Sequence, residues 1–129
     1  MNLSPFSQQD LVDQYLAAYN AFDIDGMLAP LSPSVRFENY SGGALAAKAD
    51  GIDEFRKLAE HAKTLFSERE QRITARQFND GAVIAQIAYR GRLAADIPGG
   101  PAAGTILDLN GQSEFFFDGE KISRIVDRS

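Results

Sequence analysis

The chain has 129 residues, of which 44% are apolar and 24% charged, and it carries a net charge of −5. This composition is typical of a globular protein, and the length suits one domain over residues 1–129. The acidic balance argues against a surface that neutralises phosphates, so we expect no nucleic-acid partner. The chain has no cysteine, which excludes disulfides and thiolate nucleophiles. It also has no apolar run near the 18 or so residues of a membrane span and no leader-like start, so we expect no membrane partner and a cytoplasmic location.

Helical periodicity dominates the first part of the chain. Residues 7–22 are predicted to form a helix capped by Ser7, with Asp10 completing a capping box. Its apolar stripe carries Leu11, Val12, Tyr15, Ala18, Tyr19 and Phe22. A second, short helical turn follows Asp23 and is limited by two prolines, because proline removes a backbone donor.

The middle of the chain alternates between extended and helical patterns. Residues 35–40 read as a strand, and residues 44–49 as a loop or an extended arm. Asp50 is the expected cap of a third helix that runs to about Phe66. The inward stripe of this helix contains Ile52, Phe55, Leu58, Ala59, Ala62 and Phe66.

The last half of the chain has the period of β-strands. Strands are predicted at 73–78 and 82–93, and residues 104–129 read as a hairpin around an Asp118-Gly119 turn. One face of the hairpin carries Ser113 and Asp127 in rows that are otherwise apolar. Helices packed on one face of such a meander indicate the α+β class. We expect the long strands to curl into a half-open cone, with a cavity between sheet and helices.

Three segments carry a resemblance to a known family. They are QYLAAYNAFDIDGMLAPLSPSVRFENY at 14–40, DGIDEFRKLAEH at 50–61 and EFFFDGEKISRIVD at 114–127. Together they resemble the nuclear transport factor 2-like superfamily, in the branch with ketosteroid isomerase and the SnoaL-like polyketide cyclases. The resemblance implies a cone-shaped, strongly curved antiparallel or mixed sheet wrapped around three N-terminal helices. It implies the activity only weakly, because this fold hosts isomerases, cyclases, hydrolases and non-enzymatic modules.

The isomerase pattern is only partly kept. Tyr15 matches the first-helix tyrosine that donates to the developing oxyanion. Asn39 stands where the isomerase has its general-base aspartate, and Ser113 stands where it has a protonated aspartate. An amide cannot remove a proton from carbon, so steroid isomerase activity is not expected.

Asp127 matches a final-strand carboxylate that SnoaL-like relatives often carry in an H-W-D pattern. Here Ile125 and Val126 precede it, so the histidine of that pattern is missing. Asp127 is either a general base in a partly apolar wall or a carboxylate that is solvated or paired with Arg124 or Arg128.

The other candidate residues also have two interpretations. Tyr15 is either a hydrogen-bond donor to a ligand or part of the core. Asn39 and Ser113 either bind a ligand oxygen or satisfy Tyr15 through a water. The further expected ligand-binding residues are Tyr19, Phe37, Phe55, Phe115, Phe117 and Ile125. His61 is expected at the surface, and we expect no metal and no cofactor.

These observations favour a protein that binds a small hydrophobic molecule. The leading hypothesis is a cofactor-independent lyase or isomerase that transfers a proton on a carbonyl- or hydroxyl-bearing substrate, with Asp127 and Tyr15 as catalytic residues. The alternative is a non-catalytic ligand-binding or dimerisation module. A homodimer through the outer face of the sheet is expected, because Phe116 and Ile106 would leave apolar surface there.

Overall fold

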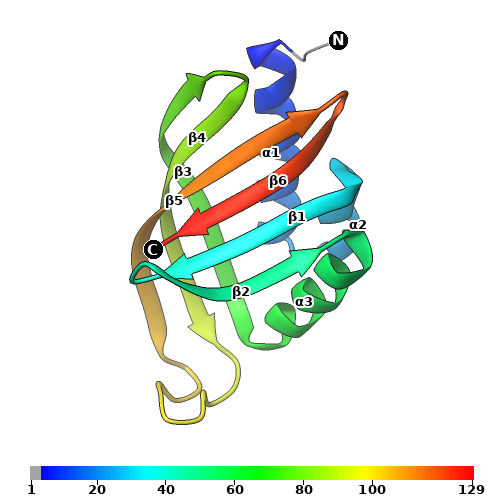
Figure 1. Ribbon diagram of the computed structural model, residues 1–129. Helices are drawn as coiled ribbons and strands as arrows, with labels where there is room; N and C mark the ends of the chain where they lie inside the picture. Colours follow the sequence, from blue (N-terminus) through cyan, green and yellow to red (C-terminus); the bar gives the residue numbers. More distant parts are fainter. Residues whose placement is uncertain (1–3) are drawn as a thin grey trace.

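The computed structural model describes residues 4–129 as three helices and one six-stranded sheet (Figure 1). The elements in chain order are α1 (Pro5–Asn20), α2 (Ile24–Leu28), β1 (Leu31–Ser41), β2 (Ala44–Asp50), α3 (Ile52–Thr64), β3 (Phe66–Asn79), β4 (Ala82–Leu93), β5 (Ile106–Asp118) and β6 (Lys121–Arg128).

The sheet is mixed and open. Its strand order is β2-β1-β6-β5-β4-β3, and every neighbouring pair is antiparallel except β1 and β6, which run parallel. The strands twist and curve around the helices, which lie on the concave face (Figure 1). The predicted α+β class and cone-shaped sheet are therefore confirmed.

The first helix begins earlier than predicted. Ser4, not Ser7, is the N-cap, and its side chain accepts a hydrogen bond of 3.2 Å from the Ser7 backbone N–H. Pro5 follows in the first turn, where its missing N–H leaves no helical bond unmade. The helix ends at Asn20, and Phe22 just beyond it takes a positive φ of 58°.

Residues 44–49, which were predicted to be a loop or an extended arm, belong to strand β2. It pairs antiparallel with β1 and is the edge of the sheet. Asp50 ends this strand, so its predicted role as a helix cap is wrong. Gly51 occupies the cap position with a φ of 90°, a conformation that glycine adopts without a side-chain clash. Strand β3 is also longer than the predicted 73–78.

The core lies between the helices and the concave face of the sheet. Its fully buried side chains include Val12, Val35, Val83, Phe115, Ile122 and Ile125. Within residues 4–129, no helix has the length and apolar character needed to cross a membrane.

The convex face of β1, β5 and β6 is covered by paired polar side chains. Arg124 binds Glu38, and the Arg124 guanidinium also lies 5.4 Å from the ring of Phe116. Phe116 is half-buried, whereas Ile106 is 42% exposed. The homodimer expected through this face stays a prediction.

Candidate functional site

Two adjoining cavities lie on the concave face of the sheet. The inner cavity, of about 200 Å³, lies between α1, α3 and β1, and the outer cavity, of about 280 Å³, extends over β4, β5 and the C-terminal residues. Among the described residues 4–129, four line both cavities, and all four have polar side chains: Tyr19, Asn39, Gln71 and Asp127. We call these four residues the polar belt.

Most of the inner cavity is apolar. Phe37 from β1 and Phe55 from α3 meet edge-to-face, with their ring centroids 5.6 Å apart. Tyr15 lies beside them and packs against Phe55 at 6.2 Å. This cavity therefore suits a flat, apolar group with a hydrogen-bond donor at its wall.

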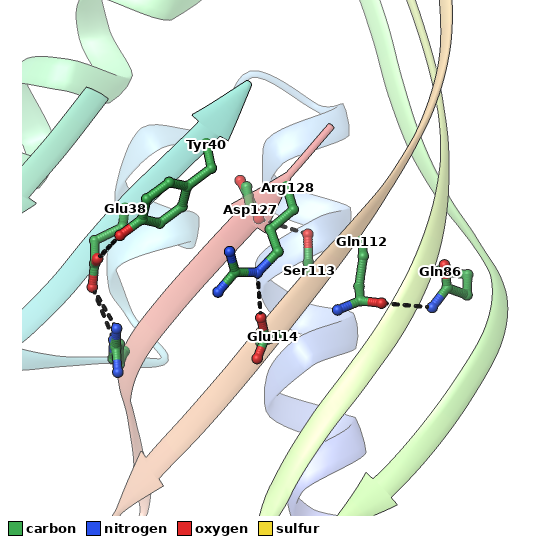
Figure 2. Close-up of polar contacts among 9 residues, drawn as sticks. Glu38, Tyr40, Gln86, Gln112, Ser113, Glu114, Asp127 and Arg128 are labelled. Atoms are coloured by element: carbon green, nitrogen blue, oxygen red, sulfur yellow. Dashed lines mark hydrogen bonds and ion pairs between the residues drawn. The ribbon is translucent and has the colours of Figure 1, made fainter. Parts of the chain in front are cut away.

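Asp127 is the carboxylate of the polar belt. It lies opposite Ser113 in the β5–β6 register and opposite Asn39 in the β1–β6 register. The buried Ser113 hydroxyl donates to Asp127 Oδ1 at 2.6 Å (Figure 2). Three neighbouring strands thus place an acid, an alcohol and an amide side by side.

The two arginines near Asp127 in sequence lie on the other face of the sheet. Arg128 binds Glu114 at 2.8 Å in front of the strands, whereas Asp127 and Ser113 lie behind them, on the helix side (Figure 2). Arg124 likewise pairs with Glu38 at 2.7 Å. Since none of the ion pairs formed within residues 4–129 includes Asp127, this carboxylate faces the cavities and is not paired with an arginine.

Burial sets the protonation of this site. Removal from water raises the pKa of Asp127 to about 6, against the opposing effect of the Ser113 hydrogen bond. The pKa of Tyr15 is raised well above its ordinary value, first by burial and then by the negative charge of Asp127. Near neutral pH the site therefore offers an ionised carboxylate and a protonated phenol.

The remaining belt residues differ in how they are bound. The Tyr19 hydroxyl donates to the Tyr89 hydroxyl at 3.3 Å. The side-chain amides of Asn39 and Gln71 have no hydrogen-bond partner within the described part of the chain, residues 4–129. They are therefore available to a ligand in either cavity.

Three of the expected ligand-binding residues do not line the two cavities. Phe115 and Ile125 are fully buried, and Phe115 packs behind Tyr15 with ring centroids 6.0 Å apart. Phe117 lies at the margin of the core, beyond a register shift in β5. Phe115 therefore supports the cavity wall from behind Tyr15.

Sequence reasoning did not identify Gln71, Phe66 and Tyr89 as site residues. Gln71 precedes the predicted strand at 73–78, so its direction was not assigned. Phe66 was predicted to end the inward stripe of the third helix, but that helix ends at Thr64 and Phe66 begins strand β3. Tyr89 shares one face of its strand with Ile87, and a phenol in that apolar row was the available signal. His61 is exposed, as expected. Within residues 4–129, no three His, Cys, Asp or Glu side chains gather as a metal site requires.

Solved structures share this fold over nearly the whole chain. A candidate polyketide cyclase from Xanthomonas campestris superposes with a TM-score of 0.83 at 24% identity, over 96% of this chain and 90% of that chain. A candidate polyketide cyclase from Pseudomonas putida gives 0.74 at 26% identity, over 98% and 90%. An uncharacterised cystatin-fold protein from Novosphingobium aromaticivorans gives 0.74 at 18% identity, over 93% and 96%.

A search of curated protein sequences found no match to the chain. The family model of the SnoaL-like domain matches residues 12–125, which is most of the chain. The protein therefore belongs to the SnoaL-like domain family, within the nuclear transport factor 2-like superfamily.

Proposed function

We propose that the protein is a cofactor-independent enzyme of the lyase or isomerase type. It transfers a proton to or from a carbon atom of a small, largely apolar substrate that bears a carbonyl or hydroxyl group. The observation that carries this proposal is the position of Asp127: its carboxylate lines both cavities, and the nearby arginines pair on the other face of the sheet.

Asp127 is the proposed general base. A base is most effective when its pKa is close to the working pH, and burial raises the pKa of Asp127 to about 6. Ser113 acts as a positioning residue, because its short hydrogen bond fixes the orientation of the carboxylate. An aspartate with the ordinary pKa near 4 would be a weaker base at neutral pH.

Tyr15 is the proposed donor to the substrate oxygen. When Asp127 removes a proton from the carbon beside a carbonyl, the C–H electron pair moves into a carbon–carbon double bond. The π electrons of the carbonyl bond move onto its oxygen. This enolate oxygen is stabilised by a protonated phenol at the cavity wall. Asn39, beside Asp127 in the register, orients the same oxygen through its amide. Reprotonation at another carbon gives an isomer, and loss of a leaving group gives a lyase product.

Deuterium exchange tests the proposal directly. The probe is 2-tetralone, a bicyclic ketone whose protons beside the carbonyl are acidic. The wild-type protein in D₂O is expected to accelerate exchange of these protons over buffer of the same pH, measured by the loss of their ¹H NMR signals. Asp127→Asn is expected to lower the protein-dependent rate by about 10²- to 10⁴-fold, the usual contribution of a general base.

The matched control is Glu114→Gln, which makes the same chemical change on the outer face of the neighbouring strand. It is expected to retain the wild-type rate. If wild type binds 2-tetralone, as seen by shifts of its amide NMR signals, but exchange never exceeds the buffer rate, the proton-transfer proposal fails. The non-catalytic binding module then becomes the better account.

A further inference from the structure

The outer cavity contains a phenol that the proposed proton transfer does not use. Tyr89 lies on β4, lines this cavity and receives a hydrogen bond from the Tyr19 hydroxyl. Because the Tyr19 proton is directed at the Tyr89 oxygen, the proton of Tyr89 is available to a ligand in the cavity. A donor that itself accepts a hydrogen bond is strengthened by it.

Packing holds the Tyr89 ring in one place. Phe66 from β3 meets it edge-on, with ring centroids 6.0 Å apart. Gly91, two residues along β4, makes room for both rings, since a Cβ there would lie 2.9 Å from the Phe66 ring and 3.1 Å from the Tyr89 oxygen. The hydroxyl therefore occupies a fixed position at the cavity wall.

A buried positive charge lies behind this pair of phenols. Arg69 is only 6% exposed, its guanidinium stacks 3.7 Å from the centre of the Tyr19 ring, and its Nε donates to the Tyr19 carbonyl at 3.0 Å. Its Nη2 is buried with no hydrogen-bond partner, and no ion pair within residues 4–129 includes this arginine.

The charge of Arg69 acts on the phenol that faces the cavity. Burial first, and then the neighbouring Tyr19, raise the pKa of Tyr89, so the phenol stays protonated and can donate. The charge of Arg69 opposes that rise with a smaller effect. A cation that is not matched by a carboxylate favours negative charge on nearby oxygens. Because the upward effects outweigh that of Arg69, the wall around Tyr89 offers a protonated phenol to an acceptor oxygen of a ligand and does not favour a full negative charge.

We propose that Tyr89, backed by Tyr19 and Arg69, is a second subsite that binds a phenolic or enolic oxygen of the substrate. The substrate class is then an aromatic ketone with a second, hydroxyl oxygen at the end remote from the reacting carbon. The assignment of the reacting end rests on the proposed function: the ketone points to Tyr15 in the inner cavity, and the acidic C–H lies at Asp127 in the polar belt. The hydroxylated ring extends into the outer cavity.

Two matched probes test the subsite. They are 2-tetralone and 6-hydroxy-2-tetralone, which adds a phenolic hydroxyl on the aromatic ring, and both dissociation constants are measured by NMR titration of the full-length protein. Wild type is expected to bind the hydroxylated probe about five- to tenfold more tightly, the usual value of one hydrogen bond to a ligand. Tyr89→Phe keeps the ring and is expected to reduce this preference to about one.

Tyr40→Phe is the matched control, because it removes a tyrosine hydroxyl from the outer face of the sheet, where Tyr40 binds Glu38. It is expected to keep the wild-type preference. The subsite is overturned if wild type shows no preference, or if Tyr89→Phe retains it. Should Tyr89→Phe not fold, a nuclear Overhauser effect between the probe's ring protons and Phe66 in wild type decides the question, and its absence rejects the subsite.

The two proposals fail separately. Loss of the binding preference with continued deuterium exchange rejects the subsite and leaves proton transfer standing. A preference that depends on Tyr89, without any exchange, supports the subsite and rejects proton transfer.

Discussion

Carboxylates on the two faces of strands β1, β5 and β6 have different partners, and Glu38 and Asp127 have opposite pKa shifts. On the outer face, Glu114 is bound by Arg128, and on the adjacent β1 Glu38 is bound by Arg124 and Tyr40. On the inner face, one residue away in each strand, Asp127 is bound by the neutral hydroxyl of Ser113. The direction of the pKa shift differs accordingly: hydrogen bonds from Tyr40 and Arg124 lower the pKa of Glu38, whereas burial raises that of Asp127.

This difference separates charges that support the fold from a charge that is available for chemistry. A paired carboxylate at the surface is a poor base, because its partners stabilise the ionised form. A carboxylate in a cavity without a cation is destabilised when it ionises, and that instability makes it a better proton acceptor. The contrast between the two faces is therefore the physical basis of the proposed function.

Among the effects that compare the two faces, the largest is expected in the pH dependence of the exchange rate. If the ionised form of Asp127 is the base, kcat/KM for 2-tetralone should be half-maximal near pH 6 and fall about tenfold for each unit below that, or about 100-fold by pH 4. Glu38→Gln on the outer face should leave this profile unchanged. An inflection at pH 4 or lower would assign the rate to a carboxylate with an unshifted or lowered pKa.

The next effect is on stability, and its sign differs between the faces. The pKa of Asp127 is about 6 in the folded protein against 3.8 ordinarily, so the folded state loses stability as pH rises from about 4 to about 6. The shift corresponds to at most about 3 kcal/mol. Asp127→Asn should therefore raise the free energy of unfolding by about 1 to 2 kcal/mol at pH 7.5, because burial of the amide offsets part of the gain.

Urea unfolding at pH 7.5 and pH 4 measures this difference, which should disappear at the lower pH. Glu38→Gln, which removes a carboxylate with a lowered pKa, should instead be slightly less stable than wild type at pH 7.5. Equal destabilisation by both substitutions would contradict the contrast between the faces.

A smaller effect is expected from Ser113→Ala. The Ser113 hydrogen bond lowers the pKa of Asp127, so its removal should shift the inflection of the exchange profile to higher pH. A profile that does not move would show that the hydrogen bond does not hold the ionised carboxylate. Ser123→Ala, a hydroxyl removed from β6 away from the polar belt, is the control.

The last prediction concerns a homodimer through the outer face, and its disruption is expected to leave the candidate site unchanged. A homodimer through this face should sediment at twice the mass of one chain at micromolar concentration, with the exposed Ile106 at the contact. Ile106→Lys should then shift the protein toward monomer while the exchange rate is retained. If wild type sediments only as a monomer at this concentration, the predicted homodimer is wrong.

The fold was largely predictable because periodicity and turn residues agree along most of the chain. Strand β4 and the hairpin around Asp118-Gly119 were placed nearly to the residue. The exceptions have local causes. The edge strand β2 has an alanine-rich sequence with little pattern, and Ser7 resembled a cap although Pro5 after Ser4 marked the true start.

The candidate site was predictable in part. Strand alternation already implied that Asp127 cannot share a face with Arg124 or Arg128, because each lies an odd number of residues away. The sequence could not show that Phe115 lies behind Tyr15, or that Gln71 and Tyr89 approach Asp127 from distant strands. Those relations depend on the curvature of the sheet, which no local pattern specifies.

The central claim is that Asp127 is a cavity carboxylate with a raised pKa. It is tested most directly by following the Asp127 side-chain carboxyl carbon by ¹³C NMR from pH 3 to pH 9, with Asp127→Asn to assign the signal. The account predicts a titration midpoint near 6. A midpoint at or below 4 would contradict it, because such a carboxylate would be solvated or paired.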